Sequence, residues 1–438
     1  GRDGIAKKSL EEKGESLEPL FETMIQEIPP PSFDASKPFQ MLVCNLGYSD
    51  YTGRLAIGRV FHGAVKKRDE LVCLQKDKRA IPLKVTKLQT YQGLSLVEAD
   101  SVQAGDIVVL SGVEEVQIGD TISLKDNPES LERITVDPPT VSMRFLPNTS
   151  PFAGREGDFV QSARIYERLK KETLFNVAIQ VEKDEEQEGF LVKGRGELQL
   201  AILIENMRRE GFELAVGRPE VIFREENGQK LEPIEHVVIE CEDIYTGTIT
   251  EKLSIRKGIL KNMHPFGSSR VRLEFSIPSR GLIGYRSTFL TDTKGTGIMN
   301  SYLEGYESFK GSIQSRITGS LISDRQGEAV AYGLFNLEDR GRFFIKPGDK
   351  VYEGMVIGEH SRDNDLLVNP CRTKKLTNMR AAGKDENVIL TPVIPPTLEQ
   401  AMEFIKEDEL IEVTPKNIRL RKVLLDPHQR KAMEKKKA

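Results

Sequence analysis

Residues 138–226 carry an alternation of strand and helix patterns that restricts the fold more than any other stretch of the chain. The strand pattern TVSMRF comes first, a helix pattern over about Gly157 to Lys171 follows, and the strand patterns NVAIQVE and GFLVKG come next. A second helix pattern runs from about Gly196 to Glu210, and the strand pattern EVIFRE ends the segment. The order β-α-β-β-α-β is that of the ferredoxin-like split βαβ unit. We therefore predict a ferredoxin-like α+β domain over residues 138–226.

The second helix pattern has a clear apolar face. Leu200, Leu203, Ile204 and Met207 recur at helical spacing, which predicts a buried stripe, and Gly211 supplies the C-terminal cap. The turn KGRG at 193–196 enters this helix, where backbone N–H groups can hold a phosphate. Two glycines at this spacing are a weak motif, and a tight turn is the preferred interpretation.

Residues 227–310 repeat the same order. The strand EHVVIECE leads to a helix near Thr246 to Arg256, the strands ILKNM and RVRLEFSIP follow, and a helix near Leu282 to Thr291 precedes the strand GIMNSYLEGYES. This predicts a second ferredoxin-like domain over residues 227–310. Arg280 and Arg286 stand where its second helix opens, and they are candidate RNA contacts. A pair of solvated surface arginines is the simpler alternative.

Short strands dominate the rest of the chain. Residues 36–137 read as strands of even spacing with glycine turns, which predicts a closed or nearly closed β-barrel. Residues 311–438 are again mostly strands, interrupted by one helix at about Leu398 to Ile405, with Thr397 and Gln400 placed for a capping box. The tail from Lys416 is basic, and we expect its end to be disordered and attracted to polyanions.

An amphipathic helix precedes the predicted barrel. Its apolar side chains fall on one face, and three prolines at 29–31 stop it: Leu17, Leu20, Phe21, Met24, Ile25 and Ile28. Few residues lie nearby to cover this face. Packing on a segment further upstream and packing on the following domain remain equally open.

A basic segment runs from Arg362 to Lys384. It holds six basic residues and two acidic ones, whereas the whole chain has a net charge of −4. A positive stretch on a slightly acidic protein is a candidate phosphate-binding surface. Most short basic runs are solvated loops, and charge alone favours that alternative.

Motifs for catalysis are absent from residues 1–438. The sequence has no GxxxxGK[ST] phosphate loop, no Rossmann fingerprint, no HExxH and no GxSxG. The four cysteines are far apart, which fits neither a disulfide framework nor a metal knuckle and indicates a cytoplasmic compartment. No run approaches the ~18 apolar residues of a membrane helix, so no membrane partner is expected. These features predict a multidomain binding scaffold with no catalytic residues and no metal.

Several long segments together give the chain a specific resemblance. They are VSMRFLPNTSPFAGREGDFV, VKGRGELQLAILIENMRREGFELAVGRPEVIFRE, IPSRGLIGYRS, KKLTNMRAAG and IEVTPKNIRLRK. With this domain order, the chain closely resembles the BipA/TypA family of ribosome-binding translational GTPases over essentially all of residues 1–438. The resemblance implies that residues 1–35 are the last helix of a GTPase domain that the chain lacks. It also implies that this polypeptide is not an enzyme and has no cofactor, while the full-length protein hydrolyses GTP with Mg²⁺ when the ribosome stimulates it.

The resemblance implies a role for each predicted domain. Residues 36–137 correspond to domain II, residues 138–226 to domain III, residues 227–310 to domain V, and residues 311–438 to the family's own C-terminal domain. Elongation factor G inserts a further domain between the two ferredoxin-like units, and there is no room for it here, so a translocase is not expected.

In the family, a loop of the C-terminal domain reaches the acceptor arm of A-site tRNA. The corresponding RNA- and tRNA-binding residues here are Lys374, Lys375, Asn378, Arg380, Arg372, Lys384 and Arg362. The implied function is large-subunit assembly and stress- or cold-responsive translation. The implied partners are both ribosomal subunits, ribosomal RNA and A-site tRNA, bound by a monomer. The alternative is a non-enzymatic RNA- or protein-binding adaptor on the same scaffold.

Overall fold

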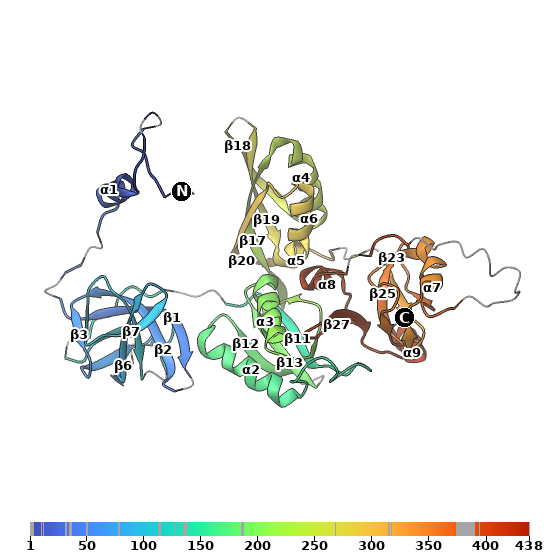
Figure 1. The fold of residues 1–438 in the computed structure, drawn as a ribbon, viewed down its shortest axis with the longest axis horizontal. Coiled ribbons are helices and arrows are strands. Elements are labelled where there is room, and N and C mark those ends of the chain that lie inside the picture. Colours follow the sequence, from blue (N-terminus) through green and yellow to red (C-terminus); the bar gives the residue numbers. More distant parts are fainter. Residues whose placement is uncertain are drawn as a thin grey trace, which may run out of the picture. The chain divides into compact units, whose positions relative to one another are not determined.

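The computed structural model describes most of the chain between residues 4 and 437. The described part leaves out residues 10, 12, 31–32, 35–36, 50, 78, 113–114, 127, 135–137, 185–187, 268, 314–315, 317, 374–389 and 394 within those limits. The chain forms two compact units, Gly1–Val136 and Asp137–Ala438 (Figure 1).

The first unit begins with the predicted amphipathic helix. Helix α1 spans Glu18–Glu27, and its C-terminal cap, Ile28, directly precedes Pro29. None of its side chains is buried, and Ile25 is 80% exposed. The helix itself is therefore confirmed, but nothing in the described part of the first unit covers its apolar face.

Short antiparallel strands make up the rest of the first unit. Eight of the described strands form one sheet in the order β5-β4-β10-β1-β2-β9-β6-β7, and β3 pairs with β8 separately. The bounds are β1 Gln40–Ser49, β2 Gly53–His62, β3 Ala64–Lys66, β4 Glu70–Leu74, β5 Ala80–Lys84, β6 Lys87–Gln92, β7 Ser95–Glu98, β8 Ser101–Gln103, β9 Ile107–Ser111 and β10 Thr121–Leu124.

The prediction of a closed barrel is not confirmed. Strands β5 and β7 are the two edges of the sheet, and no pairing among the described residues joins them. All four residues of β7 are exposed, so this strand has no buried face with which to close against β5. The sheet nevertheless encloses a core that includes Phe39, Met41, Val60 and Ile122, each fully buried.

The first predicted ferredoxin-like fold is present in the second unit. The sheet order β12-β13-β11-β14 is antiparallel throughout, as a β-α-β-β-α-β chain requires. The bounds are β11 Val141–Pro147, α2 Ser162–Phe175, β12 Gln180–Asp184, β13 Gly189–Gly194, α3 Glu197–Arg209 and β14 Leu214–Val216. The last strand differs from the predicted EVIFRE, because the fully buried Leu214, Ala215 and Val216 take the place beside β11. Only the short β15, Glu220–Val221, pairs with the other end of β11.

The same sheet continues into residues 311–438. Strand β14 pairs with β27, and the order runs on through β28, β25, β21 and β26. The apolar cluster is shared as well, since Met143 and Leu203 belong to the same cluster as Leu398 and Ile411. The bounds are β21 Ser320–Ser323, β23 Gly341–Phe343, β25 Met355–His360, β26 Leu366–Val368, α8 Leu398–Phe404, β27 Glu409–Val413 and β28 Ile418–Lys422.

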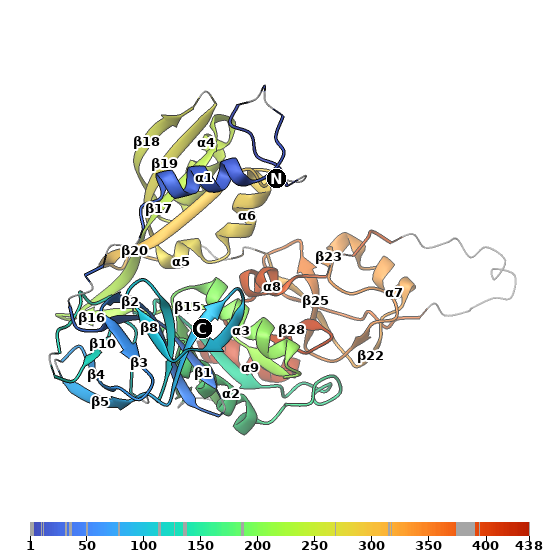
Figure 2. The ribbon, with the colours of Figure 1, turned by 60° about the vertical axis from the view of Figure 1, so that its left-hand side comes forward.

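The second ferredoxin-like fold is also present, with the strand order β20-β17-β19-β18. Figures 1 and 2 show α4 and α6 along one side of this sheet. The hairpin strand β16 extends β17 at its start. The bounds are β16 Arg224–Glu226, β17 Gln229–Glu242, α4 Thr246–Ile255, β18 Ile259–Phe266, β19 Arg270–Pro278, α5 Ser279–Leu282, α6 Tyr285–Asp292 and β20 Ile298–Ser308.

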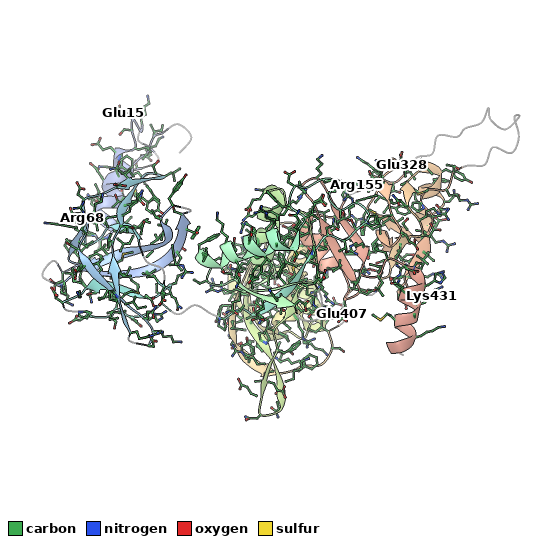
Figure 3. The ribbon with its side chains drawn as sticks, turned by 90° about the horizontal axis from the view of Figure 1, so that it is seen from below. Glu15, Arg68, Arg155, Glu328, Glu407 and Lys431 are labelled. Carbon is green, nitrogen blue, oxygen red and sulfur yellow. The ribbon has the colours of Figure 1, made fainter. Side chains whose placement is uncertain are left out.

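The C-terminal region holds the remaining elements. They are β22 Gly327–Glu328, α7 Ala331–Phe335, the 3-10 turn η2 Glu338–Arg340, β24 Lys350–Val351 and α9 Pro427–Lys437. The tail was expected to be disordered, but residues 427–437 form a helix whose Arg430 donates to the carbonyl oxygens of Leu424 and Leu425 at 2.8 and 2.6 Å. Lys431 of this helix lies at the surface (Figure 3). No helix in the described part of the chain is long and apolar enough to cross a membrane.

Candidate nucleic-acid interface

The basic segment Arg362–Lys384 lies only partly within the described residues. Arg362 and Arg372 are described, and both are exposed. The other predicted contacts lie outside the described residues: Lys374, Lys375, Asn378, Arg380 and Lys384. The structure therefore shows how the segment is attached to the fold.

The two attachment points of this segment lie against the same part of the C-terminal region. Within it, the carbonyl oxygen of Pro370 accepts from the backbone N–H of Val330 at 3.0 Å. After it, the backbone N–H of Thr391 donates to the Glu338 carboxylate at 2.7 Å. Val330 directly precedes α7, and Glu338 begins η2. Pro370, inside the basic segment, and Thr391, beyond its end, are thus both fixed beside the α7–η2 region.

The base of the segment is closely packed. Cys371 and Leu390, the one before and the other after residues 374–389, pack against the same apolar cluster, which contains Leu334 of α7. A Cβ placed on Gly333 would lie 2.4 Å from the carbonyl oxygen of Pro370, a distance that side chains do not tolerate against backbone. Position 333 therefore needs glycine for the backbone at Pro370 to pack this closely against α7.

The side chain of Arg280 is held by contacts within the fold. Its guanidinium donates to Glu232, whose side chain is fully buried, and also to the carbonyl oxygen of Gly311. It also lies 4.6 Å from the centroid of the Phe309 ring. Only 15% of the Arg280 side chain is exposed, so the groups it would offer to RNA are already engaged. Arg286 on α6 is exposed.

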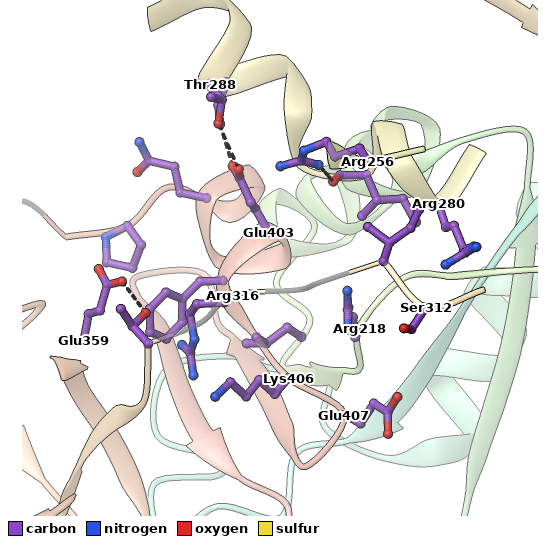
Figure 4. Close-up of a pocket in the computed structure, with 18 of the residues that line it drawn as sticks. Arg218, Arg256, Arg280, Thr288, Ser312, Arg316, Glu359, Glu403, Lys406 and Glu407 are labelled. Atoms are coloured by element: carbon purple, nitrogen blue, oxygen red, sulfur yellow. Dashed lines mark hydrogen bonds between the residues drawn. The ribbon is translucent and has the colours of Figure 1, made fainter. Parts of the chain in front are cut away.

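A cavity of about 970 Å³, which we call the junction cavity, lies between the second ferredoxin-like fold, the end of the first and the C-terminal region (Figure 4). Seven basic and three acidic residues line it. The basic ones are Arg218, Lys230, Arg256, Arg280, Arg316, Arg342 and Lys406, and the acidic ones are Glu359, Glu403 and Glu407. Figure 4 shows Arg218, Arg316 and Lys406 around one space.

Two of the three acids in the junction cavity bind hydroxyl groups. Glu403 of α8 accepts from Ser287 at 2.5 Å and from Thr288 at 3.5 Å, which connects α8 to α6. Glu359 of β25 accepts from Thr318 at 2.6 Å. Both carboxylates thus accept from neutral donors, and among the described residues neither makes an ion pair with a cation of the cavity, although the charge of Glu403 acts on Arg256.

Arg316 is a largely buried cation of the junction cavity. Its side chain is 10% exposed, and its guanidinium carbon lies 3.6 Å from the centroid of the Phe404 ring. Nη2 donates to the Ser320 hydroxyl at 3.0 Å and lies 3.5 Å from Glu409. Nε and Nη1 are buried and have no partner among the described residues.

Sequence reasoning did not identify this cavity. Its cations come from positions near 218, 316, 342 and 406, which share no local motif. Sequence reasoning recognises a basic site only where several basic residues lie close together along the chain. None of these residues lies in such a cluster.

A buried acid stands beside the junction cavity. The Glu197 carboxylate, at the start of α3, accepts from the backbone N–H of Gly284 at 3.1 Å. Burial raises the pKa of the Glu197 carboxyl to about 7, and the neighbouring charge of Glu403 adds to this rise, while Arg256 opposes it. This contact joins the first ferredoxin-like fold to the turn that precedes α6.

Three family models match the chain. "TypA/BipA C-terminal domain" matches residues 318–427, "Elongation factor G C-terminus" matches residues 229–317, and "Elongation factor Tu domain 2" matches residues 53–123. A protein of Escherichia coli strain K12, named "Large ribosomal subunit assembly factor BipA", is 49% identical over 430 residues, which cover 98% of this chain and 71% of that protein. The chain belongs to the BipA family.

Other BipA proteins agree with this assignment. The one from Haemophilus influenzae is 47% identical over 98% of this chain and 70% of its own length. The one from Synechocystis sp. is 46% identical over 97% of this chain and 71% of its own length. A crystal structure from Thermus thermophilus is 16% identical and covers 67% of this chain and 59% of that chain, with a TM-score of 0.46, too low to support an argument.

The BipA match corrects one prediction. The prediction of a non-enzymatic polypeptide is wrong, because relatives with 46–49% identity match 97–98% of the chain over about 71% of their own length. The missing phosphate-loop motif in residues 1–438 gives no reason to separate this chain from the BipA family. The prediction that it has no cofactor loses its support for the same reason.

Proposed function

We propose that this BipA-family chain acts in assembly of the large ribosomal subunit, as a ribosome- and RNA-binding protein. The observation that carries the proposal is the 49% identity over 98% of the chain to a protein named as a large ribosomal subunit assembly factor. The three matched regions, which together span residues 53–427 with gaps, are of the translation-factor type.

The proposed RNA contacts lie on the basic segment of the C-terminal region. They are Arg362, Arg372, Lys374, Lys375, Asn378, Arg380 and Lys384. Charged side chains of this kind bind backbone phosphates without reading sequence. The hydrogen bonds of Pro370 to Val330 and of Thr391 to Glu338 support the proposal, because they attach this part of the chain to the C-terminal region. The proposed targets are ribosomal RNA and the acceptor arm of A-site tRNA, with Arg286 as a second RNA contact.

The proposal includes four domains after residue 35, with bounds 36–137, 138–226, 227–310 and 311–438. It also includes action in the cytoplasm, contact with both ribosomal subunits as a monomer, and a role in stress- or cold-responsive translation. GTP with Mg²⁺ is the proposed cofactor of the family. The described residues include no group of three His, Cys, Asp or Glu side chains placed to hold a metal ion, so no contact of this chain is assigned to Mg²⁺-GTP.

Sedimentation with purified ribosomal subunits tests the proposed function. The chain should pellet with large subunits at low salt and dissociate as salt rises, because phosphate contacts release counterions. A chain that stays in the supernatant with both subunits at every salt concentration would contradict ribosome binding.

A further inference from the structure

The junction cavity contains more positive charge than its surroundings use. Within the described residues, three of its cations make no side-chain hydrogen bond or ion pair, although the charge of Lys406 acts on Asp365: Arg218, Arg342 and Lys406. Arg316 adds two buried N–H groups, at Nε and Nη1, that are also without an acceptor there. We propose that the junction cavity is a binding site for a compact anion that carries at least two phosphate groups.

Arg316 gives the strongest support, because a buried N–H group without an acceptor is costly to a fold. The nearest carboxylate, Glu409, does not supply the missing partner. It accepts from the Ser320 hydroxyl at 2.6 Å and lies 3.0 Å from the Lys422 ammonium, so its charge is shared. Phe404 closes the other face of the guanidinium. A ligand acceptor in the cavity would satisfy the two remaining N–H groups.

The acids of the cavity do not replace such a ligand. Glu403 and Glu359 are hydrogen-bonded to hydroxyl groups of α6 and of Thr318, and neither makes an ion pair with a cavity cation in the described part of the chain. Glu407 is exposed at the edge of the space in Figure 4. The cavity therefore keeps a positive charge.

The size and chemistry of the cavity define the class of ligand. A volume of about 970 Å³ is that of a small-molecule site, not of a groove for a nucleic-acid duplex. Guanidinium groups bind phosphate oxygens through paired N–H donors. One phosphate monoester carries about −1.5 to −2 charges near pH 7, so two phosphate groups balance four cations. The phosphates of an RNA strand offer guanidinium groups the same oxygens, but each phosphodiester carries one negative charge, so four of them balance four cations.

Calorimetric titration of the whole chain with inorganic pyrophosphate tests the site. The test variants are Arg218→Ala and Lys406→Ala, because neither side chain holds the fold together. The matched control is Lys261→Ala, an exposed cation on β18 outside the cavity. One pyrophosphate should bind per chain, and each test variant should weaken the affinity about tenfold, while the control stays within about twofold.

A second arm, titration with a short single-stranded RNA, separates the two sources of phosphate. Pyrophosphate binding that both cavity variants weaken supports a free oligophosphate ligand. RNA binding that the same variants weaken, without pyrophosphate binding, supports the site with RNA as the source. Absence of binding in both arms, or equal affinity of Arg218→Ala and Lys261→Ala for the ligand, overturns the proposal.

The result is independent of the proposed ribosome function. Pyrophosphate binding is measured without ribosomes, and the cavity cations do not belong to the segment Arg362–Lys384. A failed sedimentation experiment together with variant-sensitive pyrophosphate binding would reject the ribosome role alone. Sedimentation with large subunits together with no binding of either pyrophosphate or the short RNA would reject the cavity site alone.

Discussion

The guanidinium carbon of Arg316 lies 3.6 Å from the centroid of the Phe404 ring. Arg316 belongs to the connection between β20 and β21, and Phe404 is the last residue of α8. Phe404 in turn meets Phe344 edge-on, with ring centroids 5.1 Å apart. This stack forms one wall of the junction cavity and holds the connection against the C-terminal region.

Removing the Phe404 ring should destabilise the second unit. Phe404→Ala removes the cation–π contact with Arg316 and the edge contact with Phe344, and we expect a loss of about 2–3 kcal/mol in the free energy of unfolding. Phe404→Leu keeps apolar contact and should lose about half as much. Urea unfolding measures both. If the free energy of unfolding of Phe404→Ala lay within about 0.5 kcal/mol of the wild-type value, the stack would not stabilise the fold.

Arg280 should stabilise the fold through Glu232. The Glu232 side chain is fully buried, so Arg280→Ala leaves a buried carboxylate without its cation and should cost about 3–5 kcal/mol. The double variant Arg280→Ala/Glu232→Ala should recover part of this loss, because it removes the uncompensated charge. Equilibrium unfolding of Arg280→Ala, Glu232→Ala and the double variant measures the coupling. Equal losses in the single and double variants would contradict the assignment.

Glu197 should make the stability of the second unit depend on pH. Its folded pKa is about 7, against an ordinary value of 4.5, so the folded state holds more protons than the unfolded state between these values. Stability should therefore fall as pH rises from about 4.5 to 7 and change little above that range. Glu403, Glu235 and Arg256 are the charged groups that influence this carboxyl.

The variant Glu197→Gln isolates this contribution. Because one pKa unit corresponds to about 1.4 kcal/mol and Glu197 keeps some exposure, the contribution should be on the order of 2 kcal/mol between pH 5 and 7. The variant should gain stability relative to the wild type as pH rises through this range. Urea unfolding measures the free-energy difference between the variant and the wild type at pH 5 and at pH 7.5. The same difference at both pH values would exclude this role of Glu197.

Replacing Gly333 should destabilise the packing of Pro370 against α7. In Gly333→Ala, the new Cβ would lie 2.4 Å from the carbonyl oxygen of Pro370, so the chain must shift, at a cost of about 1–3 kcal/mol. Gly247→Ala in α4 is the matched control, because nothing lies within 4 Å of its Cβ position. The control should be neutral or stabilising by up to about 1 kcal/mol. Thermal unfolding that ranks the two variants in the opposite order would refute the packing argument.

Local patterns were sufficient for much of this fold. The strand and helix order of residues 138–226 and 227–310 predicted two ferredoxin-like units, and both have the expected strand arrangement. The capping box of Thr397 and Gln400 is formed at the start of α8, because it depends only on residues three apart. The stripe of Leu200, Leu203, Ile204 and Met207 is buried as its spacing predicted.

Long-range pairing could not be predicted in the same way. The short strand β14 has only Leu214, Ala215 and Val216, too few residues to show the alternating pattern of a strand. Its pairing with β27 depends on packing between distant parts of the chain. The barrel closure failed because β7 has no buried face. The junction cavity was not predicted from the sequence, because its cations come together only in the folded chain. The predicted contacts from Lys374 to Lys384 remain predictions.

Salt-dependent binding to large ribosomal subunits tests the central claim most directly. The triple variant Lys374→Ala/Lys375→Ala/Arg380→Ala is compared with Lys261→Ala/Lys346→Ala/Lys350→Ala, which removes the same charge from exposed sites elsewhere. The account predicts that the first variant binds more weakly and that its slope of log affinity against log salt is shallower by about 2–3, while the control keeps the wild-type slope. Equal slopes and affinities for both variants and the wild type would contradict RNA binding by the basic segment.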